Sequence, residues 1–261
     1  MVATRFHDGL PLVTPPVWRG DPLTGHDRAL LVATSPDVRR LVRRQGMAQD
    51  AGVPLFTSRF YAERPPCAVV GPFIGAPHAV MLLETISAWG IRRLVLFGWC
   101  GAVHHDLTPG DLLIPSSAIP DEGTSRHYSD ATDAWTPSAG INRFLFESLS
   151  AHGLTTHQGP VWSTDAIFRE TPGKIAAFRE KGAVAVDMEL SAVLAAGAAL
   201  GVEVGAVLLV SDDVSGPRWR PGFSTDRFRR ARNAVTTALM QLWETPWTPK
   251  SETERKHSAD S

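Results

Sequence analysis

The chain of 261 residues carries a formal net charge of −1, and 43% of its residues are hydrophobic. This length supports one substantial core, and the even balance of charges gives no electrostatic signature for binding nucleic acid or a membrane surface. The two cysteines, Cys67 and Cys100, have neither metal-binding nor disulfide spacing, so we expect a reducing, cytoplasmic environment. The first residues lack the apolar core of a signal peptide, and no stretch is long enough to span a bilayer.

Apolar strand patterns alternate with helical patterns along most of the chain. The expected strands cover residues 29–33, 67–70, 94–98, 112–114, 160–163, 184–186 and 204–210. The expected helices cover residues 37–45, 78–90, 138–152, 191–200 and 226–243, the first with Ser35 as its N-cap. This alternation predicts an α/β fold: a single domain with a central mixed, largely parallel sheet flanked by helices.

Both ends of the chain differ in composition from the strand-and-helix region. Residues 1–27 are rich in proline and glycine, and we expect an irregular N-terminal arm. Residues 246–261 are polar without apolar periodicity, and we expect a disordered tail. The domain is therefore expected to cover residues 28–245.

Acidic residues directly follow two of the expected strands. Asp187, Met188 and Glu189 come after the short strand, and Asp212 ends the long apolar run. Because open α/β sheets bind ligands at the carboxyl ends of their strands, we expect one cleft to hold these residues. Glu189 could accept hydrogen bonds from two vicinal hydroxyls, and Asp212 is a candidate general acid. The alternative is that these acids only cap the elements that follow.

Several segments occur in a fixed order along the chain. They are Phe97–Ala102, Leu107–Pro115, Asp121–Tyr128, Ser163–Glu170, Asp187–Glu189 and Ser211–Asp212. Together they resemble the nucleoside phosphorylase superfamily, which includes purine nucleoside phosphorylases, uridine phosphorylases and methylthioadenosine nucleosidases. The resemblance implies cleavage of the N-glycosidic bond of a nucleoside, most readily a purine nucleoside. Glu189 would hold the ribose hydroxyls, Met188 would pack on the sugar, and Asp212 would protonate N7 of the base.

The resemblance also implies a larger set of substrate-binding residues. The candidates are Asp187, Met188, Phe168, Ile167, Ser163, Trp99, Gly98, Cys100, His127 and Arg126. Phe168 either stacks on the base or packs in the core. Arg126 and His127 either bind an anion or 5′-hydroxyl or fix their own loop. Trp99 either lines the sugar pocket or packs in the core.

The phosphate-binding pattern of the family is altered at three positions, which hold Val38, Leu96 and Trp99. Apolar side chains and an indole do not bind phosphate as a guanidinium and a hydroxyl do. Weaker phosphate candidates are Arg39, Arg218 and Arg220. Phosphorolysis, with inorganic phosphate as co-substrate and no other cofactor, is the preferred interpretation. Hydrolysis by water and non-catalytic nucleoside binding are the alternatives.

A few further features of the sequence bear on other classes of function and on the oligomeric state. A serine hydrolase elbow and a dinucleotide fingerprint are both missing. His104, His105 and Asp106 predict a surface turn rather than a metal site, because adjacent histidines in an extended segment point in opposite directions. The resemblance implies a homo-oligomer, a dimer or a trimer of dimers, in which His7 could complete a neighbouring subunit's site.

Overall fold

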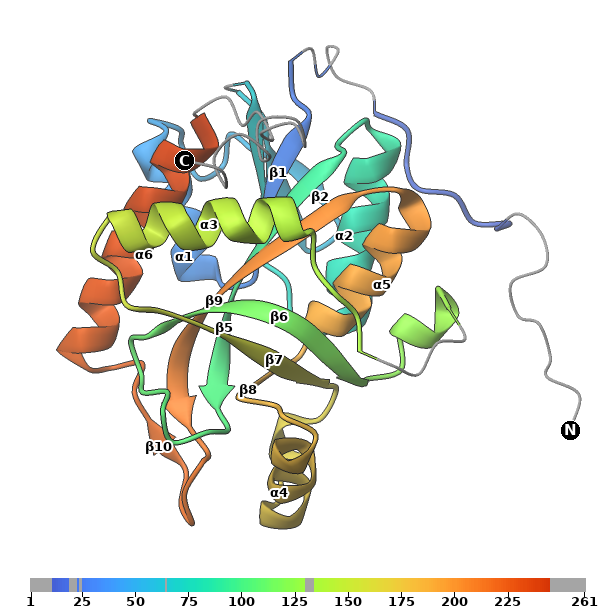
Figure 1. The fold of residues 1–261 in the computed structure, drawn as a ribbon. Coiled ribbons are helices and arrows are strands. Elements are labelled where there is room, and N and C mark those ends of the chain that lie inside the picture. Colours follow the sequence, from blue (N-terminus) through green and yellow to red (C-terminus); the bar gives the residue numbers. More distant parts are fainter. Residues whose placement is uncertain (1–10, 19–22, 24, 64, 130–133, 245–261) are drawn as a thin grey trace, which may run out of the picture.

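The computed structural model describes residues 11–18, 23, 25–63, 65–129 and 134–244 (Figure 1). The expected tail, the start of the expected arm and His7 lie outside the described residues. Within the described part of the arm, Trp18 packs against Phe60 and Trp89, with ring centroids 5.5 and 4.8 Å away. This part of the arm is therefore fixed to the domain by aromatic contacts.

The elements follow the expected alternation, with additions. The strands are β1 (Arg28–Val32), β2 (Val53–Leu55), β3 (Ser58–Tyr61), β4 (Cys67–Gly71), β5 (Arg93–Ala102), β6 (Leu112–Asp121), β7 (Thr156–Thr164), β8 (Ala185–Asp187), β9 (Glu203–Asp213) and β10 (Arg220–Pro221). The α-helices are α1 (Ser35–Arg44), α2 (Ala76–Ala88), α3 (Ala139–Ala151), α4 (Pro172–Glu180), α5 (Leu190–Leu200) and α6 (Asp226–Glu244). Two 3₁₀ turns are η1 (Ser125–His127) and η2 (Ile167–Arg169).

The strands form one mixed sheet in the order β10-β9-β6-β7-β8-β5-β1-β4-β3-β2, and β9 also pairs with β5. This additional pairing closes β5, β9, β6, β7 and β8 into a barrel. Parallel pairings join β1 to β4 and β5, β5 to β9, and β7 to β6 and β8. The single α/β domain with a mixed sheet is confirmed. The longest pairings, β5–β9 and β6–β7, are parallel as expected, but the closed barrel was not expected; the short antiparallel pairs β5–β8 and β6–β9 close the ring.

Helices cover the sheet in two groups (Figure 1). Leu83 of α2 and Val193 of α5 share one buried cluster with strand residues. Leu41 of α1, Leu145 of α3 and Leu239 of α6 belong to a second cluster. Apolar side chains therefore cover both faces of the central strands, which explains their nearly unbroken apolar runs.

Three local features differ from the expectation. The hairpin of β2 and β3 was not predicted, because its strands are only three and four residues long. The helix α4 was not predicted either, because only Ile175 and Phe178 among its nine residues are buried and the apolar periodicity is weak. The N-cap of α1 is Thr34, not Ser35, and its hydroxyl accepts from the Asp37 N–H at 3.4 Å.

None of the described helices has the length and apolar composition needed to cross a membrane.

Candidate active site

A cavity of about 350 Å³ opens where β1, β4, β5 and β9 end. Its lining residues are Ala33, Thr34, Phe73, Ile74, Trp99, Cys100, Gly101, Ile167, Glu170, Val186, Asp187, Met188, Glu189, Ser211 and Asp212. The structure thus brings the two expected catalytic acids, Glu189 and Asp212, to one cavity. Both come from chain segments that immediately follow or end a strand, as ligand sites of α/β sheets do.

Glu189 is held at the cavity by a backbone donor from the opposite side. The Gly75 N–H donates to Glu189 Oε1 at 2.6 Å. Gly75 has a φ of 77°, a conformation that glycine adopts without strain, and it precedes the first turn of α2. Burial, together with the nearby Asp187, raises the pKa of Glu189 to about 8, and burial is the larger cause. The carboxyl group is therefore protonated at neutral pH when the cavity holds no substrate.

Asp187 positions Glu189 through its own hydrogen bonds. Asp187 Oδ2 accepts from the backbone N–H groups of Glu189 at 3.2 Å and Leu190 at 2.8 Å. Its Oδ1 accepts from the Ser163 hydroxyl at 2.5 Å. Burial raises the pKa of Asp187 to about 6, opposed by these three donors. Asp187 therefore caps the start of α5, and Ser163, which is fully buried outside the cavity lining, supports it.

A β-bulge directs Asp212 into the cavity. Cys100 pairs with Val210 but Gly101 pairs with Asp212, so Ser211 is an extra residue in β9. Bulges of this kind re-aim side chains next to active sites. A Cβ on Gly101 would lie 3.2 Å from Val186 Cγ1, tighter than usual, and would touch Asp212 Oδ2 at 3.4 Å, so a glycine is favoured beside the carboxyl group.

The Asp212 carboxyl group accepts hydrogen bonds at both oxygens. The Ser211 hydroxyl donates to Oδ1 at 2.6 Å, and Trp219 Nε1 donates to Oδ2 at 2.8 Å. Trp219 belongs to the segment after β9 and is 59% exposed. A side chain that is open to solvent thus covers one face of the candidate general acid.

Trp99 lines the cavity and also packs against the helices behind it. Its ring meets Phe228 edge to face, with centroids 5.0 Å apart. Its Nε1 donates to Asp37 Oδ2 at 2.9 Å, and Asp37 in turn pairs with Arg232. Trp99 therefore lies in the wall of this cavity and is also packed against α6.

The segment Ser163–Glu170 contributes residues other than the expected phenylalanine to the cavity. Ile167 lines the cavity, whereas Phe168 is 96% exposed and does not, so the stacking role for Phe168 is not supported. Glu170, three residues after Ile167, was not predicted to line the cavity but does. Burial raises the pKa of Glu170 to about 7, and Asp212 contributes in the same direction. Its place at the end of the segment Ser163–Glu170 was the available sequence signal.

Phe73 and Ile74 were also missed. They follow β4 in a glycine- and proline-rich segment, and the strand end was the only signal for them. Cys100 lines the cavity as expected, and burial raises the pKa of its thiol well above the ordinary value. Cys100 is therefore a neutral wall of the cavity rather than a nucleophile.

The basic candidates lie outside the cavity. Arg126 and His127 are exposed on η1. Arg218 is exposed in the segment after β9, and Arg220 pairs with Asp213. None of these side chains lines the cavity, so the structure does not support their assignment to substrate or phosphate.

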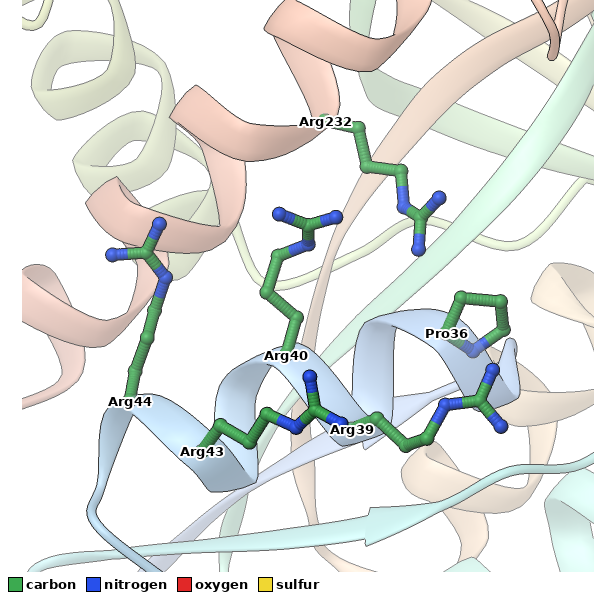
Figure 2. Close-up of a pocket in the computed structure, with 6 residues that line it drawn as sticks. All are labelled: Pro36, Arg39, Arg40, Arg43, Arg44 and Arg232. Atoms are coloured by element: carbon green, nitrogen blue, oxygen red, sulfur yellow. The ribbon is translucent and has the colours of Figure 1, made fainter.

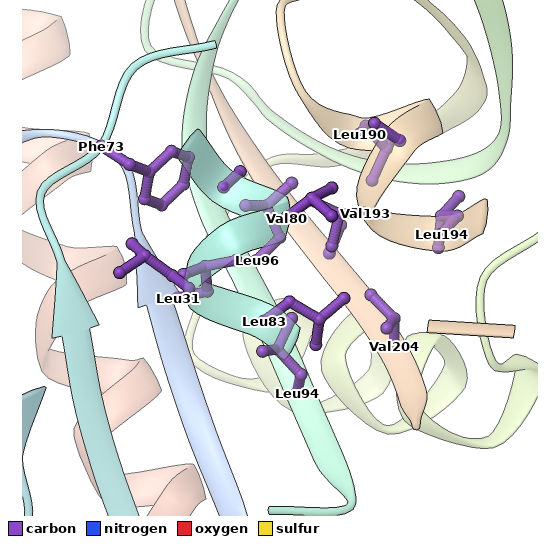
Figure 3. Close-up of a cluster of buried hydrophobic side chains, with 14 of the residues drawn as sticks. Leu31, Phe73, Val80, Leu83, Leu94, Leu96, Leu190, Val193, Leu194 and Val204 are labelled. Atoms are coloured by element: carbon purple, nitrogen blue, oxygen red, sulfur yellow. The ribbon is translucent and has the colours of Figure 1, made fainter. Parts of the chain in front are cut away.

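The other residues considered in connection with phosphate also lie outside the lining of this cavity. Arg39 lines a separate cavity between α1 and α6 (Figure 2). Leu96 is buried among leucines and valines of α2 and α5 (Figure 3), and Val38 and Gly98 are buried as well. Within the described part of the chain, no lysine, arginine or histidine lines the cavity that holds Glu189 and Asp212.

The histidine pair lies in an exposed turn, away from this cavity. His104 and His105 each approach Asp106, with N–O distances of 3.3 and 3.4 Å. Their ring centroids lie 4.2 Å apart. The expectation that the two rings point in opposite directions is therefore wrong, because the segment turns instead of continuing as a strand.

The model of the phosphorylase superfamily matches residues 27–242, which is most of the chain. The chain belongs to the phosphorylase superfamily. This match confirms the resemblance drawn from the ordered segments. Among superfamily relatives, a guanosine phosphorylase of Halorubrum lacusprofundi is 26% identical over 167 residues, which cover 64% of this chain and 69% of the relative. A DeoD-type purine nucleoside phosphorylase of Bacillus cereus is 28% identical over 162 residues, covering 61% and 68%.

Two solved structures share the fold. The AMP nucleosidase of Bacteroides thetaiotaomicron superposes with a TM-score of 0.67 at 22% identity, covering 83% of this chain and 87% of that chain. The purine nucleoside phosphorylase of Toxoplasma gondii, in complex with immucillin-H, superposes with a TM-score of 0.75 at 15% identity. The coverage is 90% of this chain and 97% of that one. At these identities the likeness concerns the fold alone.

Proposed function

We propose that this chain is an enzyme that cleaves the N-glycosidic bond of a purine nucleoside, with water as the nucleophile. One observation carries the choice of water. The cavity holds two acids suited to the ribose and to the leaving base, but no cationic side chain among its described lining residues. Burying a phosphate dianion without a cation is costly, whereas a water molecule needs no charge partner.

The cavity residues divide the reaction between sugar and base. Glu189, as a carboxylate, accepts hydrogen bonds from the 2′- and 3′-hydroxyls, and Met188 packs against the ribose. Asp187 keeps Glu189 in place through the backbone at the start of α5. In the enzyme without substrate, the pKa of Glu189 is about 8, so its carboxyl group is protonated at neutral pH. Glu189 therefore loses this proton when it binds the ribose hydroxyls as a carboxylate.

Asp212 acts on the leaving base. As the C1′–N9 bond breaks, its electron pair passes into the purine, and Asp212 donates a proton to N7. Water adds to C1′ and loses a proton, which restores the acid form of Asp212. The products are the free base and ribose.

Phosphorolysis is the second candidate, and the names of the sequence relatives favour it. It requires a cation beside the cavity that the described lining residues do not supply. We also propose that the chain forms a homo-oligomer, in which a second copy could provide this cation. Non-catalytic binding of a nucleoside is a third candidate, but a proton donor held in a cavity by a β-bulge has no use in simple binding.

The test is release of base from inosine, adenosine, guanosine and uridine in phosphate-free buffer, followed by titration with phosphate. We expect turnover of purine nucleosides without phosphate and no increase when phosphate is added. Turnover that depends on phosphate would instead support phosphorolysis. No release from any of the four nucleosides under either condition would refute cleavage of these nucleosides and favour the binding role.

A further inference from the structure

A second cavity lies between α1 and α6, and arginines form most of its wall. It measures about 480 Å³ and is lined by Pro36, Arg39, Arg40, Arg43, Arg44 and Arg232. Figure 2 shows Arg40 and Arg44 extending from α1 toward α6, and Arg232 extending from α6 toward α1. This arginine pocket shares no lining residue with the candidate active site. Asp37 and Trp99 lie between the two cavities, joined by their hydrogen bond.

The positive charge of the arginine pocket is poorly compensated by the chain itself. Arg232 pairs with Asp37, but within the described ranges Arg39, Arg40, Arg43 and Arg44 form no ion pair with a carboxylate. Five guanidinium groups thus face one carboxylate. Guanidinium groups gathered around one cavity repel one another unless an anion lies among them.

Arg40 shows this lack of compensation most clearly. Its Nη1 donates to Asn233 Oδ1, a neutral acceptor, while its Nε is buried and has no hydrogen-bond partner. Burial lowers the pKa of Arg40, and the neighbouring Arg232 and Arg44 lower it further, against the opposing effect of Asp37. Buried donors are nearly always satisfied in folded proteins, so this donor indicates a missing acceptor.

The geometry restricts the class of acceptor. Guanidinium groups bind phosphate through two parallel hydrogen bonds, and arginines that approach from two helices suit several phosphates better than one. The cavity has the volume of a small-molecule site.

We propose that the arginine pocket between α1 and α6 binds a small polyphosphate, that is, two or more linked phosphates, either free or as the phosphate chain of a nucleotide. The site is independent of the proposed nucleoside cleavage, and its occupancy is measured without turnover. Tripolyphosphate is the first probe, because it carries no nucleoside that could enter the catalytic cavity.

The experiment is isothermal titration calorimetry of the full chain at low ionic strength with tripolyphosphate, ATP, orthophosphate and citrate. The test variant is Arg39→Gln/Arg43→Gln, which removes two exposed arginines of the pocket. The control is Arg143→Gln/Arg230→Gln, which removes the same charge from exposed positions outside the pocket. Equal thermal unfolding curves for the variants and the wild type establish that all of them fold.

We expect tripolyphosphate to bind to wild type and control alike, and on the order of tenfold or more weakly to the test variant. Orthophosphate and citrate should bind more weakly than tripolyphosphate to the wild type. If ATP binds more tightly than tripolyphosphate and loses affinity in the same variant, the ligand is a nucleotide; equal affinities identify free polyphosphate. No binding of tripolyphosphate, equal weakening in the control, or equal affinity for citrate would each overturn the proposal.

Discussion

Replacing Glu189 by glutamine should stabilise the fold at alkaline pH. In the folded chain burial raises the pKa of Glu189 from 4.5 to about 8, whereas the unfolded chain keeps the ordinary value. Between these two pH values the folded state binds a proton that the unfolded state has lost. The stability of the wild type therefore falls as the pH rises from about 4.5 to about 8.

The size of the effect follows from the same shift. One pKa unit corresponds to about 1.4 kcal/mol, so the penalty reaches at most about 4–5 kcal/mol above pH 8. Glutamine removes this penalty while its side-chain oxygen can still accept from the Gly75 N–H. For a chain of this length, the gain corresponds to a rise in Tm on the order of 5–10 °C.

The assay is thermal unfolding of wild type and Glu189→Gln followed by circular dichroism from about pH 5 to about pH 9. The Tm difference should be small at the acid end and grow with pH. The control Glu147→Gln, which changes an exposed acid on α3, should show no such trend. Parallel curves for wild type and Glu189→Gln across the range would refute the buried, protonated state of Glu189.

Three further predictions concern the cavity. Asp212→Asn should lower kcat for purine nucleosides by roughly 10²–10⁴-fold, because an amide cannot donate the proton; steady-state kinetics check this, and near-normal activity would make Asp212 structural. Glu170→Gln should remove a step near pH 7 from the pH profile of kcat/KM, since the pKa of Glu170 is raised to about 7; an unchanged profile would rule out its ionisation as a factor. Trp99→Ser should lower the free energy of unfolding by about 3 kcal/mol in urea titrations, because it removes the contact with Phe228 and the hydrogen bond to Asp37. No loss would show that Trp99 is not part of a packed wall.

The elements that bury apolar runs were predictable from the sequence. The strand up to Val210 and the helix Leu190–Leu200 follow from unbroken apolar patterns. Glu189, directly before that helix, and Asp212, at the end of that strand, lie at one cavity as predicted. The closure of the barrel was not predictable, because the pairing of β8 with β5 depends on a three-residue strand whose direction no periodicity encodes.

The directions of the side chains within the site could not be predicted from the sequence either. Ile167 and Phe168 are adjacent and both apolar, yet only Ile167 faces the cavity, because the 3₁₀ turn sets the direction of each. The bulge at Ser211 shifts the register of Asp212 by one position. The alternation of side chains along a regular strand would therefore assign Asp212 to the wrong face of the sheet. The arginine pocket was also missed, because Arg232 joins the arginines of α1 only through the packing of α6 on α1.

The nucleophile is tested most directly by identifying the sugar product in saturating phosphate. Base release from a purine nucleoside is followed while ³¹P NMR monitors phosphate esters and a reducing-sugar assay measures ribose. The account predicts one free ribose for each base released and no signal from ribose 1-phosphate. Ribose 1-phosphate formed in equal amount to the base would contradict it.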